Sequence, residues 1–358
     1  MLNIIEQFPI DGDPLSCTPI KSGHINQTFL IETTTGSRYI LQKINQYVFP
    51  NIDALIHNMS AISLFLSNQN TQNKAMIQYL PDRNGDTFYD DGEGGCWRIY
   101  RFVENSICLQ RPEEPSDFQE CARAFGRFQF ALSEFPVSEL QETIVHFHDT
   151  PDRYRILREV VATDPVHRVK DVEEEIRFAF SREEKACILQ KMQEEGTLPI
   201  RATHNDTKIN NVLLDADTKK AICVIDLDTV MPGLAAFDFG DAIRFGASTA
   251  VEDEPQLERI GLDLELYRYF ARGFLESCPV FTKEEKESFA YGALSITLEC
   301  GVRFLTDFLK GDKYFSIDYP THNLVRARAQ FQLAKDMENQ FQKMISIVKE
   351  EDQIGKRD

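Results

Sequence analysis

The pattern of apolar and polar positions changes character near residue 104. Before it, alternating segments predict three antiparallel strands, "LSCTPIK", "NQTFLIE" and "RYILQKI", joined by the turns "SGHI" and "TTTGS". Residues 51–68 carry apolar side chains at helical spacing, and two further strands are expected in "AMIQYL" and "CWRIYRFVE". The pattern therefore predicts a small antiparallel sheet with one helix.

Beyond residue 104 the apolar positions follow helical spacing over most of the chain. This spacing recurs in five segments, at 117–135, about 171–195, 256–277, 283–309 and 325–349. Residues 200–230 are the exception, because they read as two short strands joined by a turn, with polar residues at both outer ends. We expect an α+β protein with two lobes, residues 1–104 and residues 105–358.

Composition and charge narrow the class of protein. The chain has 358 residues, more than one core usually holds, and no apolar stretch is long enough to span a membrane. The segment "MLNIIEQFPIDGD" lacks the features of a signal peptide, so we expect a cytoplasmic location. The net charge of -18 opposes binding to nucleic acid or to an anionic membrane. A phosphate ligand would need a local positive patch or a metal, and acidic residues are expected to hold Mg²⁺.

Cysteine spacing gives no sign of a zinc site or a disulfide framework. The eight cysteines are scattered, never form Cys-x-x-Cys, and mostly lie in apolar segments. We expect free, buried thiols at Cys17, Cys96, Cys108, Cys121, Cys187, Cys223, Cys278 and Cys300.

Candidate chemistry is concentrated in "THNDTKINN", residues 203–211, and in "VIDLDT" further along. If the two apolar runs form a hairpin, Asp206, Asn211 and Asp226 converge on one edge. Phosphoryl transfer needs such a group. One carboxylate accepts the proton of the attacking hydroxyl, while an amide oxygen and a second carboxylate hold Mg²⁺.

The spacing in this segment supports the same interpretation. The positions of His204, Asp206 and Asn211 match the catalytic-loop signature of kinases, and Asp226 stands where their second metal-holding aspartate would be. The alternative is a polar loop rich in turn-forming residues. The downstream aspartate and the preceding sheet and helix weigh against that alternative.

Together, "THNDTK", "VIDLDT", "FDFGDAIRFGAST", "HFHDTP" and "GHIN" resemble the aminoglycoside phosphotransferase and choline kinase superfamily, small-molecule kinases with a protein-kinase-like fold. "HFHDTP", "FGDAIRFGAST" and "ECGVRFLTDFLKGDKYF" resemble the N-acetylhexosamine 1-kinases more closely, and the likeness runs from about residue 15 to 345. The resemblance implies a bilobal kinase that uses ATP and Mg²⁺ to phosphorylate the anomeric hydroxyl of N-acetylglucosamine or N-acetylgalactosamine. It implies Asp206 as the base and Asn211 and Asp226 as magnesium ligands.

Two positions concern the charge on the phosphates. Lys208 is placed to offset charge on the moving phosphoryl group, with a solvated loop lysine as the alternative. In the strand "RYILQKI", Gln42 rather than Lys43 should share a face with Ile40, so either an amide replaces the phosphate-binding lysine of kinases or the register is shifted by one. The helix at 51–68 has no glutamate to pair with such a lysine.

Further nucleotide contacts are expected at the sheet tip and at the lobe junction. Gly23 and His24 occupy the place of a glycine-rich loop, although an ordinary hairpin turn and a structural histidine explain them equally well. The backbone of Phe102, Val103 and Glu104 is placed to meet adenine. We expect Trp97 in the core of the small lobe.

The segment "FDFGDAIRFG" supplies several candidate supporting residues. Asp241 is a suitable N-cap for a helix, and the resemblance implies that it also braces the catalytic loop, while Asp238 is either a turn former or site support. Arg244 and Phe245 either reach the sugar pocket or serve packing and surface charge.

Arg303 interrupts an apolar helix, where a guanidinium is costly unless it is paired or faces a cleft. The resemblance supports a contact with a sugar hydroxyl, with Tyr314 beside it, and the alternative is an ion pair with Asp307 one turn away. "HFHDTP", residues 146–151, is poor zinc geometry and is expected to line or support the acceptor pocket.

Two rival functions remain at this point. One is another kinase of the superfamily, acting on an aminoglycoside, choline, homoserine or methylthioribose. The other is a nucleotide-binding pseudokinase, suggested by Gln42 and the missing helix glutamate. The expected partners are ATP and a small sugar, with the chain a monomer or a weak homo-oligomer.

Overall fold

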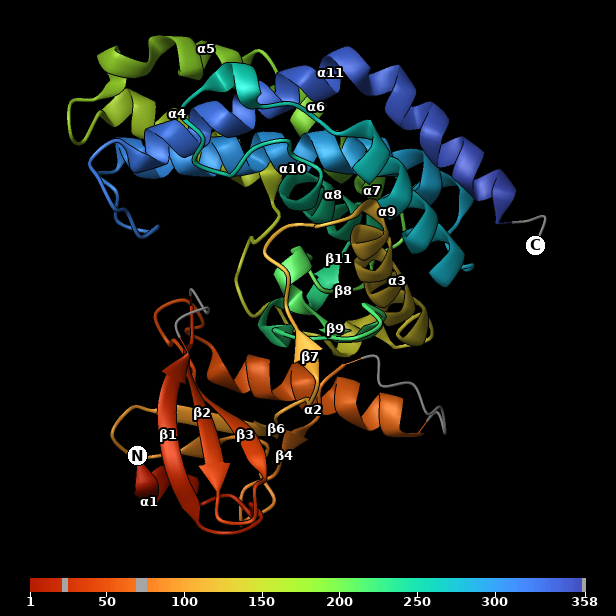
Figure 1. Ribbon diagram of the computed structural model, residues 1–358. Coiled ribbons are helices and arrows are strands. Elements are labelled where there is room, and N and C mark those ends of the chain that lie inside the picture. Colours follow the sequence, from red (N-terminus) through yellow and green to blue (C-terminus); the bar gives the residue numbers. More distant parts are fainter. Residues whose placement is uncertain (21–24, 69–75, 356–358) are drawn as a thin grey trace.

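The computed structural model describes residues 1–20, 25–68 and 76–355. Figure 1 shows two parts, a sheet with one long helix and a larger, mainly helical part that carries the C-terminal half of the chain. We call them the small lobe and the large lobe. The expected α+β class is confirmed.

The small lobe is built on an antiparallel sheet with the order β1-β2-β3-β6-β4, and β5 pairs with β6. The strands are β1 (Pro14–Ile20), β2 (Gln27–Thr33), β3 (Arg38–Lys43), β4 (Tyr79–Leu80), β5 (Tyr89–Asp90) and β6 (Cys96–Arg101), with helices α1 (Leu2–Ile5) and α2 (Ile52–Asn68). The three predicted strands and the predicted helix are confirmed. Only the last two residues of "AMIQYL" form a strand, because Met76 instead bridges to Val224 of the large lobe.

Alternation along β3 decides which side chains face the large lobe. Tyr39 and Leu41 are buried on one face with Trp97, which confirms Trp97 as a core residue. Ile40 belongs to the other core, which the sheet shares with α2 and the large lobe, so Gln42 points the same way as Ile40. The expected register is therefore confirmed.

The large lobe packs its helices around one extended core. Its helices are α3 (Pro115–Ala131), α4 (Thr150–Thr163), α5 (Glu173–Phe180), α6 (Glu183–Ala186), α7 (Ile188–Glu194), α8 (Ala235–Gly246), α9 (Leu264–Ser277), α10 (Lys283–Leu309) and α11 (His322–Ile354). Helix α10 packs against α8 and α11, and α3 packs against α9. The segment expected at 171–195 is broken into three short helices, and the helix expected from 256 begins only at Leu264. Within the described ranges, no helix is both long and apolar enough to cross a membrane.

The predicted hairpin is confirmed and lies against the small lobe (Figure 1). Strands β9 (Val212–Asp215) and β10 (Ala221–Val224) pair antiparallel, and β7 (Ser106–Ile107), from the lobe junction, adds to β9. A second ribbon pairs β8 (Arg201–Thr203) with β11 (Met231–Gly233). The loop 204–211 and the turn 225–230 connect the two ribbons, which brings their polar residues together.

All eight cysteines are free thiols, as expected. The expectation that all eight are buried is wrong for Cys108. Four are buried and three are partly buried, but Cys108 is exposed and lies in the wall of the cleft between the lobes. Cys108 directly follows β7, the short strand that pairs with β9 beside the cleft.

Candidate functional site

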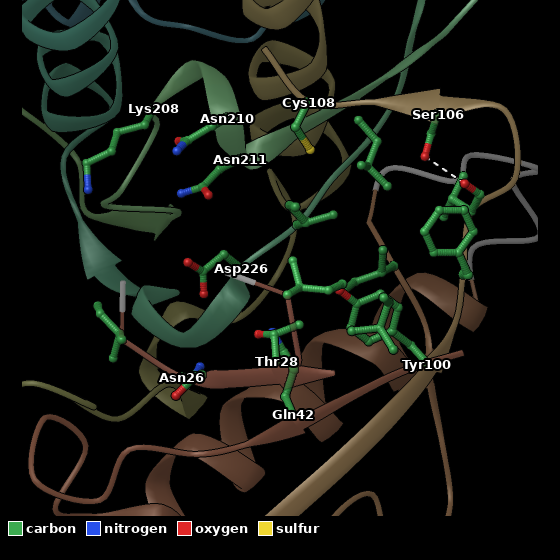
Figure 2. A pocket seen from close by; sticks show the side chains of 18 of the residues that line it. Asn26, Thr28, Gln42, Tyr100, Ser106, Cys108, Lys208, Asn210, Asn211 and Asp226 are labelled. Atoms are coloured by element: carbon green, nitrogen blue, oxygen red, sulfur yellow. Dashed lines mark hydrogen bonds between the residues drawn. The ribbon is translucent and has the colours of Figure 1, made fainter. Parts of the chain in front are cut away.

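A cleft of about 240 Å³ separates the sheet of the small lobe from the β9–β10 hairpin. Figure 2 shows polar side chains entering it from both sides, with Asp226 near its centre. The small lobe contributes Asn26, Thr28, Gln42 and Tyr100, and the large lobe contributes Asp206, Lys208, Asn210, Asn211 and Asp226. The three residues expected to converge therefore line one cleft.

Asp206 is held by its neighbours in the catalytic loop. Asn211 Nδ2 donates to the backbone carbonyl of Asp206 at 2.8 Å and to its Oδ2 at 3.0 Å. Lys208 Nζ lies 2.8 Å from the other carboxylate oxygen, Oδ1. Burial alone would raise the pKa of Asp206, but Lys208 and Asn211 outweigh it and bring the pKa below its usual range. The carboxylate is therefore ionised at neutral pH.

Helix α8 fixes the backbone just before this aspartate. Asp238 is fully buried and accepts hydrogen bonds from the backbone amides of His204 and Asn205, at 3.0 and 2.7 Å, and from Gln129 Nε2 at 2.6 Å. His204 Nε2 donates to the carbonyl of Ile225 at 2.9 Å, which ties the loop to the residue preceding the metal-binding candidate. Of the two roles considered for Asp238, turn former or support of the site, the hydrogen bonds favour support of the site.

The N-cap assignment of Asp241 was wrong. Helix α8 begins at Ala235 after the N-cap Leu234, so Asp241 lies in mid-helix, where it accepts from Arg244. The start lies earlier because Ala235 and the residues after it already bury a helical face against the core. The hydrogen bonds to the catalytic loop come from Asp238, one turn before Asp241.

Asp226 follows β10 in a left-handed backbone conformation, with φ of 59° and ψ of 61°. Burial and the nearby carboxylates of Asp228 and Asp206 raise the pKa of Asp226 to about 7. Such a shift marks a site with an excess of negative charge and a shortage of cations.

This excess fits a divalent cation. Asn211 uses its nitrogen on Asp206, so its side-chain oxygen remains available, and carboxylate and amide oxygens are the ligands that Mg²⁺ prefers. In the part of the chain that the structure describes, no cluster of three or more His, Cys, Asp or Glu could hold a metal alone. A cation between Asn211 and Asp226 would therefore take further ligands from water or a bound phosphate.

The lobe junction forms the other end of the cleft. Phe102 and Val103 line it, and Ser106 Oγ donates to the carbonyl of Val103 at 2.6 Å (Figure 2). Glu104 is not among the lining residues, and its exposed side chain pairs with Arg38.

At the sheet tip, Gly23 and His24 lie outside the described residues. Ile20, Ile25 and Asn26, which flank them in sequence, line the cleft. The contact expected of Gly23 and His24 stays a prediction.

Gln42 faces the cleft, while Lys43 lies over the ring of Trp97 at 5.3 Å. Gln42 Nε2 is 3.3 Å from Thr28 Oγ1, and its Oε1 accepts from Arg98 Nε at 2.9 Å. Of the two candidates in this strand, the amide and not the lysine therefore faces the cleft. Of the described residues that line the cleft, only Lys208 is cationic.

Within α10, Arg303 does not pair with Asp307. Asp307 instead accepts the backbone amides of Lys313, Tyr314 and Phe315 at 2.9 to 3.0 Å, which organises the loop after α10. The ion-pair alternative for Arg303 is therefore wrong, because the carboxylate of Asp307 is already occupied by the loop.

The guanidinium of Arg303 rests on aromatic rings, with Phe147 at 5.3 Å and Phe315 at 5.6 Å. Among the described residues it has neither an ion pair nor a hydrogen bond. Burial opposes its charge, but Tyr314 is close enough to help raise the pKa of Arg303. Burial and the charge of Arg303 lower the pKa of Arg153, so two guanidinium groups lie near each other.

Arg244 has partners of its own. It is buried and donates to Asp241 at 2.8 and 3.1 Å and to Glu252 at 2.7 Å. Phe245 is partly buried against the core. Contact of either residue with an acceptor stays a prediction.

A model of the phosphotransferase enzyme family matches residues 16–273, more than half of the chain. The chain belongs to this family.

Solved structures with a similar fold include an aminoglycoside phosphotransferase and small-molecule kinases. An aminoglycoside phosphotransferase from Alicyclobacillus acidocaldarius has a TM-score of 0.63 at 11% identity, covering 98% of this chain and 96% of that one. A choline kinase from Cryptosporidium parvum has a TM-score of 0.59 at 15% identity, covering 96% of each chain. An amicoumacin kinase in complex with AMP-PNP and Ca²⁺ has a TM-score of 0.59 at 13% identity, covering 92% of each. At these identities the likeness concerns the fold, which is the expected bilobal, protein-kinase-like fold.

Two supporting groups of this phosphotransferase were missed from the sequence. The first is Arg98, whose buried guanidinium pairs with Asp228. The only signal was an arginine between the apolar residues Trp97 and Ile99.

The second is His148. From the sequence, its motif "HFHDTP" was expected only to line or support the acceptor pocket. Its Nε2 donates to the carbonyl of Asn205 at 3.1 Å, and its Nδ1 lies 3.0 Å from a carboxylate oxygen of Glu299, which also accepts from Thr150. Glu299 thus anchors one ring nitrogen, while the other holds the backbone carbonyl that precedes Asp206. The same motif starts α4, with Asp149 as N-cap and Pro151 in the first turn, a helix that the sequence analysis did not predict.

Proposed function

We propose that this phosphotransferase transfers the γ-phosphoryl group of ATP to the anomeric hydroxyl of an N-acetylhexosamine, giving the sugar 1-phosphate and ADP. The observation that carries the proposal is the convergence of Asp206, Asn211 and Asp226 on one cleft between the lobes. AMP-PNP bound to an amicoumacin kinase of the same fold supports ATP as the donor.

In this mechanism Asp206 accepts the proton of the sugar hydroxyl as the new O–P bond forms and the bond between the β-γ bridging oxygen and the γ-phosphorus breaks. An anomeric hydroxyl is more acidic than an ordinary alcohol, so an ionised carboxylate of modest basicity suffices. Lys208 Nζ lies 2.8 Å from Asp206. From there its ammonium group can offset the negative charge that develops on the transferred phosphoryl group. Asn211 and Asp226 would hold Mg²⁺, which neutralises charge on the phosphate oxygens.

Charge on the large lobe supports the proposed acceptor class. Arg303 has a guanidinium without an ion pair among the described residues, and Arg153 lies near it. Among the described residues, Glu299 is the one carboxylate that lies near both of these cations. The excess of positive charge opposes choline and polycationic aminoglycosides, whereas a neutral sugar offers hydroxyl and acyl oxygens to a guanidinium donor. Together with the motifs shared with N-acetylhexosamine 1-kinases, this favours the sugar.

A coupled assay for ADP release tests the proposal. With ATP and Mg²⁺, we expect turnover with N-acetylglucosamine or N-acetylgalactosamine and none with choline, homoserine, methylthioribose or kanamycin. Preference for one of the other acceptors would replace the sugar assignment but keep the kinase. No ADP release with any acceptor, despite nucleotide binding, would identify a pseudokinase.

A further inference from the structure

Kinases commonly hold the nucleotide phosphates with a strand lysine that is paired with a helix glutamate. This chain has Gln42 at the strand position, and α2 contains no glutamate. The residue of α2 that reaches this region is Met59, whose Sδ lies 3.3 Å from Arg98 Nη1. Both halves of the usual pair are therefore replaced.

A cation does occupy this face of the sheet, but on the neighbouring strand. Arg98 on β6 pairs in register with Gln42 on β3 and donates from Nε to its side-chain oxygen at 2.9 Å. Its Nη1 donates to Asp228, and the exposed fractions of the two side chains are 0% and 1%. The guanidinium also lies 4.7 Å from the ring centre of Tyr79.

Asp228 belongs to the large lobe and follows Asp226 by two residues, so this ion pair joins the lobes beside the metal-binding candidate. Its second carboxylate oxygen accepts from Asn26 Nδ2 at 2.6 Å, and its backbone carbonyl accepts from Thr143 Oγ1 at 2.8 Å. The left-handed turn that presents Asp226 is thus held from both lobes.

We propose that Arg98 is a positioning residue that acts through Asp228 to hold Asp226 for a magnesium-bound nucleotide, in place of the absent lysine–glutamate pair. Arg98 is not among the residues lining the cleft, so it does not act by touching the phosphates. Without the guanidinium, Asp228 would keep a buried charge with no counter-charge, next to the like charge of Asp226. The inference rests on the proposed function, because it assumes that Mg²⁺ and nucleotide bind there.

The test compares Arg98→Met with Arg101→Met, a control on the same strand whose side chain is 61% exposed. Titration calorimetry measures the affinity for AMP-PNP in Mg²⁺ and in EDTA. We expect Arg98→Met to weaken binding in Mg²⁺ by about 10- to 100-fold, as loss of an outer-shell partner of a metal ligand does. Binding in EDTA should not change, and Arg101→Met should match the wild type in both conditions.

Two further variants show whether the charge pair is responsible. Arg98→Lys restores the charge but not the hydrogen bond to Gln42, so part of the Mg²⁺-dependent affinity should return; this variant also serves if Arg98→Met does not fold. Asp228→Asn should reproduce the loss, and the double variant Arg98→Met/Asp228→Asn should be no worse than either single one, because both act through one contact.

Different results would overturn the positioning role of Arg98 and the proposed function. Equal weakening in Mg²⁺ and EDTA, or an Arg98→Met protein that binds like Arg101→Met, would overturn the positioning role alone. A folded wild-type protein whose AMP-PNP affinity gains nothing from Mg²⁺ would overturn the proposed function and the positioning role together.

Discussion

The side-chain nitrogen of Asn211 donates hydrogen bonds to both the backbone carbonyl and the carboxylate of Asp206, at 2.8 and 3.0 Å. One side chain thereby orients the proposed base while its own oxygen is left for a metal. The five-residue spacing between them makes this possible, because the short 3₁₀ turn Ile209–Asn211 folds the chain back toward Asp206. The base and one metal ligand therefore form a single local unit.

Asp206→Asn should remove the base and keep the shape of the loop. We expect kcat to fall by about 10²- to 10⁴-fold, the usual contribution of a general base. The affinity for AMP-PNP in Mg²⁺ should stay nearly the same, since Asn211 and Asp226 are intact. Steady-state kinetics and calorimetry check the two parts, with the exposed turn variant Asp217→Asn as control. Substantial residual turnover would remove Asp206 from this role.

The local nature of this unit explains why it could be predicted from the sequence. The catalytic loop, the β9–β10 hairpin and the strand register at Gln42 depend on near neighbours and on alternation, which a single sequence displays. The convergence of Asp206 with Asp226 followed from pairing two adjacent strands.

The supporting groups could not be predicted in the same way. Arg98 meets Asp228 across 130 positions, and Asp238 meets the amide of Asn205 across 33. Such contacts are decided by how separate elements pack, and neither residue type reveals its partner in advance. The N-cap assignment of Asp241 failed for a related reason, since a suitable residue type does not decide where the buried face of a helix begins.

Arg303→Met should separate acceptor binding from nucleotide binding. A hydrogen bond to a charged group contributes about 1.5–3 kcal/mol, so KM for the N-acetylhexosamine should rise by about 10- to 100-fold. KM for ATP should not change. Arg328→Met, which removes an arginine paired with Glu175 on another helix, is the matched control. A rise in both KM values would show a general disturbance of the fold instead of a sugar contact.

At Gly240, helix α8 lies very close to the backbone of α10. A Cβ on Gly240 would lie 2.3 Å from the carbonyl oxygen of Gly292, and one on Gly292 would lie 2.1 Å from that of Ala236. Gly240→Ala should therefore push the helices apart and lower the free energy of unfolding by about 1–3 kcal/mol. Gly355→Ala, where the nearest atom is 3.8 Å away, should have little effect. Chemical denaturation measures both, and equal stabilities would show that the two helices can move apart at little cost.

Glu351 near the end of α11 gives a pH-dependent test of stability. Its side chain is fully buried and accepts from Arg268 and Arg272, both at 2.7 Å. Burial would raise the pKa of Glu351, but the two guanidinium groups outweigh it and lower the pKa from its ordinary value of 4.5. A carboxylate with a depressed pKa stabilises the fold above its unfolded-state pKa, and this contribution disappears as pH falls through the folded-state pKa.

Glu351→Gln should therefore lower the free energy of unfolding at neutral pH by about 1.5–3 kcal/mol, the range for hydrogen bonds to charged groups. Below about pH 4.5 the difference between variant and wild type should shrink, because the protonated carboxyl and the amide carry the same charge. Urea denaturation at a series of pH values measures the difference. Glu350→Gln, which removes a more exposed carboxylate from the same arginine cluster, should have a smaller effect at every pH, since ion pairs at the surface contribute little. A difference for Glu351→Gln that stays constant down to acid pH would mean that packing, and not the charge of Glu351, holds α11 to α9.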